Sequence, residues 1–314
     1  MIPAVASQIA RKPRALRKGS RVRFVSPASP MKEEKLGRMT ELLESEGYVV
    51  ERSKNILASD FHLAGTDEQR AADLMDAFLD PAVDAILCTR GGYGCARLMP
   101  LLDLDKMAAS GKLFVGFSDI TTVHIALNRR GLPTIYAPMA VTFTVDREPW
   151  VIESFKRALR GEISTPDGVP PGETLVPGQA EGEVTGGCLC LITDSLATPD
   201  SIDCEGKIVL MEDVDEHPHR IDAMLTHLLN AGEIQKAAGI VVGEMTGTDD
   251  KPDEAIGGKP WRAIVDERLR PLGIPSIVNF PFGHAKNMLS LPLGVKARLD
   301  AVAGTLTYLE SPCA

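Results

Sequence analysis

Residues 112–127 read KLFVGFSDITTVHIAL, and this stretch decides the fold that we expect. Its first part, Lys112 to Val115, is an apolar run with the length of a buried strand. Its last part, Ile120 to Leu127, carries apolar residues at helical spacing. Gly116 to Asp119 lie between them and predict a sharp turn. A strand that passes directly into a helix is the repeating unit of an α/β fold with a parallel sheet.

Ser118 stands at this turn, in front of the first free N–H groups of the helix. Its position is similar to a nucleophile elbow with the pattern Gly-x-Ser-x-Gly, although Ile120 replaces the second glycine. The alternative is that Ser118 or Asp119 only caps the helix. The stretch by itself leaves both interpretations open.

The same alternation of strand and helix surrounds this stretch. Strands are predicted over residues 21–26, 48–51 and 85–89, and helices over 33–47 and from residue 66 onwards. Thr66 and Gln69 match a capping box at the start of the second helix. We therefore expect a mostly parallel sheet with helices on both faces. Ligands of such sheets bind beyond the carboxyl ends of the strands.

The chain has 314 residues, which is enough for two domains. Residues 161–186 are rich in proline and glycine and are predicted to be a linker. This divides the chain into an N-terminal α/β domain over residues 1–160 and a smaller α/β domain over 187–314. The second domain is predicted to contain strands at 207–211, 239–242 and 274–280 and helices at 220–229 and 260–269.

Composition excludes several classes of protein. A net charge of −9 argues against a nucleic-acid binder, and no apolar run is long enough to cross a membrane. The basic N-terminal stretch, which includes Arg11 and Lys12, lacks the apolar core of a secretory signal. Most of the six cysteines lie in apolar runs, so we expect a cytoplasmic protein with reduced thiols. Cys188 and Cys190 are too close for a usual zinc pair, and no second pair follows at finger spacing, so no metal is expected.

Polar residues follow four of the apolar runs. Gly91 and Gly92, which lie between Arg90 and Tyr93, let the backbone approach a ligand and offer a donor for an oxyanion hole, with the Asp119 N–H as the other. The alternative is a tight turn without a ligand. Ser118 is the second of these sites.

Glu212 ends the third apolar run and is followed by Asp213, Asp215 and Glu216. It is a candidate to orient a histidine, and the alternative is a solvated acidic loop. Asp213 would point to the opposite side of an extended chain, so the two acids cannot share one role. We expect the neighbouring acids to be more solvated than Glu212.

His284 follows the last strand, and Gly283 would let its ring turn into a cleft. His124 lies within the helix after Ser118 and points elsewhere, and His217 and His219 lack a third metal ligand and suit an exposed loop. Ser118, Glu212 and His284 together provide a nucleophile, a base and an acid that fixes the base. Their order in the chain does not show that they meet.

The sequence resembles the LD-carboxypeptidase family of serine peptidases from about residue 21 to residue 299. The family includes muramoyl-tetrapeptide carboxypeptidases and microcin C immunity peptidases, which cleave an aminoacyl-nucleotide toxin. The motifs that carry the resemblance are Ala64-Gly65-Thr66-Asp67, Asp80-Pro81, Cys88-Thr89-Arg90-Gly91-Gly92-Tyr93-Gly94, Gly116-Phe117-Ser118-Asp119-Ile120-Thr121, Met211-Glu212-Asp213, Arg220-Ile221-Asp222 and Phe282-Gly283-His284.

The resemblance implies a catalytic triad of Ser118, His284 and Glu212 between two domains. It also implies an oxyanion hole or substrate site around Gly91, Gly92 and Asp119, with Arg90 and Tyr93 beside them. The implied fold is a glutamine-amidotransferase-like N-terminal domain with a swivelling β/β/α domain after it. The family is usually homodimeric, cytoplasmic and free of cofactors.

The chain departs from the family pattern at three places. Tyr136-Ala137 replaces His-Gly before Pro138-Met139, Cys188 replaces the asparagine of Gly-Gly-Asn-Leu, and Ala197-Thr198 replaces Gly-Thr. The expected function is removal of a C-terminal D-amino acid from a muropeptide stem through an acyl-enzyme. The alternatives are a microcin-immunity-like peptidase or amidase acting on aminoacyl-nucleotide conjugates, and a two-domain ligand-binding protein without catalysis.

Overall fold

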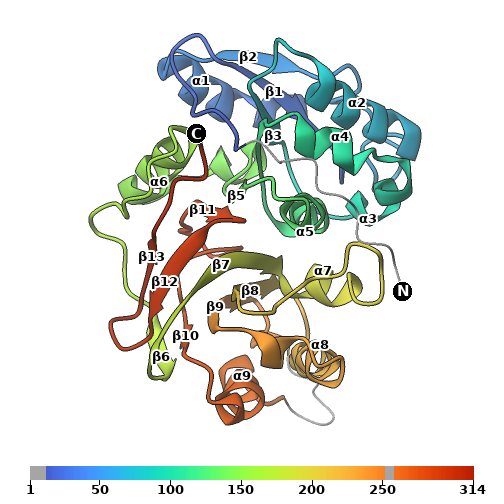
Figure 1. The fold of residues 1–314 in the computed structure, drawn as a ribbon. Helices are drawn as coiled ribbons and strands as arrows, with labels where there is room; N and C mark the ends of the chain where they lie inside the picture. Colours follow the sequence, from blue (N-terminus) through green and yellow to red (C-terminus); the bar gives the residue numbers. More distant parts are fainter. Residues whose placement is uncertain (1–11, 252–257) are drawn as a thin grey trace.

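The computed structural model describes residues 12–251 and 258–314, so Arg11 of the basic N-terminal stretch lies outside the described residues. Two sheets organise the chain, one above the other in Figure 1. The first sheet has the strand order β11-β5-β4-β3-β1-β2. β1 to β5 run parallel, and β11 is antiparallel to β5. Their bounds are Arg21–Val25 (β1), Val49–Arg52 (β2), Ala85–Cys88 (β3), Leu113–Gly116 (β4), Thr134–Tyr136 (β5) and Leu291–Leu293 (β11).

Helices cover both faces of this sheet, as predicted. Side chains alternate along β4, where Phe114 packs with α2, α4 and α5 on one face and Val115 packs with α1 and α6 on the other. The predicted capping box at the start of α2 is present, because the Gln69 N–H donates to Thr66 Oγ1 and the Thr66 N–H donates to Gln69 Oε1. The helices are Gly37–Ser45 (α1), Asp67–Leu79 (α2), Cys95–Leu98 (α3), Leu104–Ala109 (α4), Thr121–Arg129 (α5) and Pro149–Leu159 (α6).

The second sheet has the order β13-β12-β7-β8-β9-β10-β6, with β7 to β10 parallel and antiparallel strands at both edges. Its strands are Glu173–Val176 (β6), Gln179–Cys188 (β7), Ile208–Val214 (β8), Gly239–Thr246 (β9), Ser276–Val278 (β10), Lys296–Asp300 (β12) and Thr305–Tyr308 (β13). Its helices are Leu189–Asp194 (α7), Pro218–Asn230 (α8) and Trp261–Leu269 (α9). Short 3-10 helices are Glu33–Lys35 (η1), Met99–Leu101 (η2), Ser118–Ile120 (η3), Ala140–Thr144 (η4), Ile234–Lys236 (η5) and Arg270–Leu272 (η6).

The two faces of the second sheet have different neighbours. Val209 and Met211 of β8 pack beneath α7, α8 and α9. Ile208 and Leu210 of the same strand belong to a core that also contains Val123 of α5 and Tyr136 of β5. The second sheet therefore packs directly on the first domain (Figure 1).

Two predictions about domain organisation need correction. The interval 161–186 is not an irregular linker, because β6 and most of β7 lie in it. Its glycines permit close backbone contacts within the sheet, since a Cβ on Gly186 would lie 2.1 Å from the carbonyl oxygen of Leu210. The C-terminal segment also returns to the first domain, where β11 joins the first sheet and the Ala314 N–H donates to the carbonyl of Pro13.

None of the helices in the two described ranges is long and apolar enough to cross a bilayer.

Candidate active site

Ser118 occupies the sharp turn between β4 and α5. Its φ is 65°, in the left-handed region that side chains other than glycine rarely adopt, so the turn holds the serine in a strained conformation. Gly116 makes the turn possible, because a Cβ there would lie 2.9 Å from Ile120 Cγ2. No side chain caps η3 or α5, and the Asp119 carboxylate instead accepts the Cys95 N–H at 2.8 Å. The cap interpretation of Ser118 and Asp119 is therefore wrong for the helices that begin at this turn.

His284 lies between Ser118 and Glu212. Its Nε2 is 3.0 Å from Ser118 Oγ, and its Nδ1 is 2.7 Å from Glu212 Oε2. The backbone N–H of His284 donates to the same carboxylate oxygen at 3.0 Å. A carboxylate on Nδ1 holds the proton of the neutral ring there and leaves Nε2 free to accept the serine proton.

Glu212 is completely buried within β8, and this burial fixes its orientation. The strand was expected to end at Met211 but continues to Val214, with a register shift against β9 between Met211 and Asp213. Gly283 has a φ of 85° and packs directly on the Glu212 carboxyl group. A Cβ at Gly283 would lie 2.4 Å from Glu212 Oε2, so only glycine leaves the carboxylate room to reach His284.

The charge of Glu212 affects the pKa of His284. Burial by itself lowers the pKa of His284, but the negative charge of Glu212 and its hydrogen bond outweigh burial and raise that pKa above its ordinary value. The ring of Phe117 lies 4.9 Å from the imidazole, centroid to centroid. The arrangement favours the imidazolium that forms when the histidine takes a proton.

Tyr136 joins the site in a way that sequence reasoning missed. Its hydroxyl donates to Glu212 Oε1 at 2.6 Å and accepts the Ser118 N–H at 3.1 Å. The tyrosine thereby satisfies the second oxygen of the buried carboxylate and ties it to the nucleophile turn. The only sign of this role in the sequence was that Tyr136 replaces the family's histidine. The contacts that Tyr136 makes depend on the strand pairing, which the sequence does not show.

The glycine turn after β3 lies against the serine. A Cβ on Gly91 would be 2.9 Å from Ser118 Oγ and 3.3 Å from the Asp119 nitrogen, so the glycine keeps the space in front of both atoms open. Gly92 is exposed and has a φ of 108°. Buried Arg70 donates to the carbonyl of Gly94 at 3.0 Å and holds the turn in place.

Arg90 and Tyr93 lie at this turn, and their hydrogen bonds are to residues outside the triad. The guanidinium of Arg90 donates to the carbonyl of Pro30 at 3.1 Å. Tyr93 is exposed, its N–H donates to Ser29 Oγ, and its ring packs near His62. Their contacts position the turn and leave the Tyr93 ring available at the surface.

The acids that follow Glu212 differ in how far they are buried. Asp213 points away from Glu212, as predicted, but it is buried and not solvated. Burial, with the neighbouring charge of Glu212, raises the pKa of the Asp213 carboxyl to about 6. Asp215 is exposed and pairs with Lys251 at 3.0 Å.

His124 points away from the triad, as predicted, whereas His219 lies in the first turn of α8 and not in the expected loop. His124 is buried away from the triad, where its Nδ1 lies 2.8 Å from Thr134 Oγ1, and burial lowers its pKa to about 4. His217 and His219 are exposed, with their rings stacked at the start of α8.

Comparison with known proteins identifies the family. Residues 22–137 match the LD-carboxypeptidase N-terminal domain, and residues 181–299 match the LD-carboxypeptidase C-terminal domain. The chain belongs to the LD-carboxypeptidase family. A putative carboxypeptidase from Streptomyces coelicolor is 40% identical over 96% of this chain and 96% of its own length. A probable murein peptide carboxypeptidase from Bacillus subtilis is 35% identical over 94% of this chain and 93% of its own.

Solved structures agree with the sequence relatives. The crystal structure of muramoyltetrapeptide carboxypeptidase from Oxalobacter formigenes superimposes with a TM-score of 0.79 at 29% identity, and covers 91% of this chain and 97% of that chain. The predicted two-domain α/β fold is confirmed, and the protein is a serine-type carboxypeptidase of the LD-carboxypeptidase family.

Proposed function

We propose that this LD-carboxypeptidase removes the C-terminal D-amino acid from a muropeptide stem, with Ser118 as nucleophile, His284 as base and Glu212 as orienting acid. The single observation that carries the proposal is the continuous contact from Ser118 Oγ through both nitrogens of His284 to the buried carboxylate of Glu212, with distances of 3.0 Å and 2.7 Å. The muropeptide substrate is supported by the names of the murein peptide and muramoyltetrapeptide carboxypeptidases that the chain resembles.

The reaction follows from these contacts. Ser118 Oγ attacks the carbonyl carbon of the last peptide bond while His284 Nε2 takes its proton. The imidazolium, stabilised by Glu212, then gives that proton to the departing amine. The peptide is now bound to Ser118 Oγ as an ester. Water attacks this ester while His284 again takes and returns the proton, and the shortened peptide leaves.

The developing oxyanion needs donors beside the nucleophile. The open space kept by Gly91 lies in front of Ser118 Oγ and the Asp119 nitrogen. Backbone N–H groups of the Gly91-Gly92 turn and of Asp119 are our candidates for the oxyanion hole. The Ser118 N–H is not a candidate, because it already donates to the hydroxyl of Tyr136.

The proposal also includes the division of the site between two domains, an oligomeric state and a compartment. We place the nucleophile and glycine turn in the N-terminal domain, up to about residue 160, and Glu212 and His284 in the C-terminal domain, whose sheet begins with β6 at Glu173. We also retain a homodimer in the cytoplasm as the expected state. The six free thiols, five of them buried, agree with a reducing compartment.

The test is cleavage of a synthetic stem tetrapeptide that ends in an L–D amide bond. Mass spectrometry should detect the tripeptide and the free D-amino acid with the wild-type protein. The diastereomer that ends in an L-amino acid should stay intact. Ser118→Ala should keep the fold and lose roughly 10⁴–10⁶-fold in turnover.

An aminoacyl-nucleotide conjugate serves as the second substrate in the same assay. Cleavage of the conjugate without cleavage of the tetrapeptide would replace the muropeptide assignment with the microcin-immunity-like alternative. Binding of one or both substrates with cleavage of neither would favour the non-catalytic alternative. Turnover by Ser118→Ala within about tenfold of the wild type would exclude the triad itself, because triad losses are far larger.

A further inference from the structure

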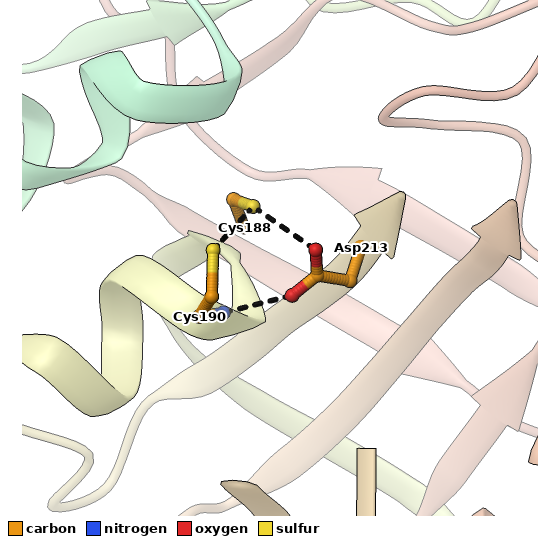
Figure 2. Close-up of side chains that lie close together, drawn as sticks. All are labelled: Cys188, Cys190 and Asp213. Carbon is orange, nitrogen blue, oxygen red and sulfur yellow. Dashed lines mark hydrogen bonds between the residues drawn. The ribbon is translucent and has the colours of Figure 1, made fainter. Parts of the chain in front are cut away.

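Cys188, Cys190 and Asp213 form a compact group, which we call the dithiol–carboxylate cluster (Figure 2). Cys188 ends β7, Cys190 lies in the first turn of α7, and Asp213 lies near the carboxyl end of β8. The sequence excluded a zinc finger because the two cysteines lack a second pair. The fold supplies a third ligand from a strand that is distant in the sequence.

The ligand atoms of the cluster converge on one point. The two Sγ atoms are 3.4 Å apart, and Cys188 Sγ is 3.7 Å from Asp213 Oδ1. One ligand atom from each residue lies within 4.8 Å of the others. Within residues 12–251 and 258–314, this is the one group of three histidine, cysteine or acidic side chains that meets this criterion.

These separations match the edges of a tetrahedral metal site. Zinc–sulfur bonds of about 2.3 Å and zinc–oxygen bonds of about 2.0–2.2 Å place tetrahedral ligands roughly 3.8 Å apart for two sulfurs and roughly 3.5 Å apart for sulfur and oxygen. The observed separations differ from these values by a few tenths of an ångström. A cation could therefore bind with small side-chain adjustments.

The backbone around the cluster already fixes its ligands. Asp213 Oδ2 accepts the Cys190 N–H and Oδ1 accepts the Val214 N–H, each at 2.8 Å. The Cys188 N–H donates to Thr121 Oγ1 at 3.0 Å, which holds the end of β7 against α5. Hydrogen bonds of this kind orient metal ligands in protein sites.

Charge and access also suit a cation. Glu212 is the chain neighbour of Asp213 and faces Cys188 across the β7–β8 pair, so two carboxylates lie close to the thiols. Cys188 and Asp213 are buried, whereas Cys190 is partly exposed and opens the cluster to solvent. Thiolates select zinc-class cations over hard cations such as magnesium.

We propose that the dithiol–carboxylate cluster binds one zinc-class divalent cation, with Cys188 and Cys190 as thiolates, Asp213 as a carboxylate and water in the fourth position. Each cation displaces the two thiol protons, so that M²⁺ and two thiols give the bound metal dithiolate and two protons. The bound cation joins the start of α7 to β8, one residue from Glu212. The proposal does not depend on the proposed substrate.

The test uses the full-length protein, reduced and treated with chelator. Zinc is titrated in competition with a chromophoric chelator, and cadmium is then added while the ultraviolet thiolate-to-cadmium band is recorded. The wild type should bind one equivalent, release two protons in weak buffer and show the band of two thiolates. A protein that cannot compete with the chelator, or that binds without proton release, would overturn the proposal.

Variants assign the ligands. Cys190→Ser and Asp213→Asn should both weaken zinc binding. Loss of an outer-shell partner lowers metal affinity roughly 10–100-fold, and Cys190→Ser should lower it by more than that. Cys204→Ser is the matched control, since Cys204 is a buried thiol in the core beneath α7 and α8. It should bind zinc like the wild type.

Circular dichroism checks that each variant is folded. If buried Cys188→Ser does not fold, partly exposed Cys190→Ser decides the assignment. Wild-type affinity in folded Cys190→Ser, or equal loss of affinity in Cys204→Ser, would show that the cluster does not hold the metal. A Cys188–Cys190 disulfide that persists after reduction and prevents zinc binding would also contradict the proposal.

Discussion

Gly283→Ala tests whether the contact between a single glycine and Glu212 controls catalysis. A Cβ at Gly283 would lie 2.2 Å from Glu212 Cγ and 2.3 Å from Cδ, whereas ordinary van der Waals contacts begin at 3.4 Å. The carboxyl group therefore has to move by about 1 Å, and a misplacement of that size costs on the order of 10²-fold in rate. Glu212 Oε2 accepts two hydrogen bonds from His284, so the movement disturbs the orientation of the base.

A matched variant separates this effect from backbone strain. Gly19 has a φ of 87°, close to the 85° of Gly283, but a Cβ there would meet nothing within 4 Å. Both alanine variants should lose roughly 1–2 kcal/mol in the free energy of unfolding, because the left-handed conformation costs that much for a residue with a Cβ. Gly283→Ala should lose about 1–3 kcal/mol more from overpacking.

The assay compares kcat/KM for the tetrapeptide with the midpoint of urea unfolding for both variants. We expect a fall in kcat/KM of roughly 10²-fold for Gly283→Ala and less than about twofold for Gly19→Ala. Near-normal activity in a folded Gly283→Ala protein would refute the reasoning, because Glu212 would then tolerate displacement.

Three other predictions follow from the site and its surroundings. Tyr136→Phe removes a hydrogen bond to a buried carboxylate and should lower the free energy of unfolding, measured in urea, by about 1.5–3 kcal/mol. The control Tyr308→Phe removes a hydrogen bond to the neutral carbonyl of Pro292 and should lower it by only about 0.5–1.5 kcal/mol. Glu212→Gln should reduce turnover roughly 10²–10⁴-fold. It should also move the acid limb of the kcat/KM profile to lower pH, because the charge that raises the pKa of His284 is gone and the ring stays neutral in more acidic solution. An unmoved limb would contradict the assigned role of Glu212. Thiol counting in denaturant without reductant should find six free groups, and a lower count in a fresh sample would contradict the expected reducing compartment.

Much of the nucleophile half of the site could be predicted from local sequence. Residues 112–127 alternate strand, turn and helix within one short stretch, and both β4 and α5 follow from apolar spacing. Gly91 and Ser118 each follow a parallel strand, so the rule that sites lie at the carboxyl ends of strands places them at one edge of the sheet. The sequence of the first domain alone therefore predicts that Gly91 and Ser118 lie close together.

The β6–β7 region could not be predicted in this way, because its structure depends on partners far along the chain. Gly182 and Gly186 suggest a loop by composition, yet they lie in a strand between β8 and β12, where neighbouring backbones leave no room for a Cβ. At Gly187, in the same strand, the side chains of Thr121 and Tyr136 leave no room for one. The same dependence explains β11, which completes the first sheet with residues from near the end of the chain.

Tertiary contacts also decided the roles of individual polar residues. Asp213 was expected to be solvated, but β8 extends past Glu212 and buries it against Cys188 and Cys190. Tyr136 could be recognised only as a departure from a family pattern, since its bond to Glu212 spans two sheets. Local periodicity has no information about such long-range pairs.

Covalent labelling with a serine-reactive fluorophosphonate, followed by peptide mapping with mass spectrometry, tests the central claim most directly. The central claim is that His284 and Glu212 activate Ser118 as the nucleophile of this carboxypeptidase. The predicted result is a single adduct on Ser118, formed far more slowly in Glu212→Gln and absent in Ser118→Ala. An active protein that gains no adduct on Ser118, or that gains it equally fast in folded Glu212→Gln, would contradict the account.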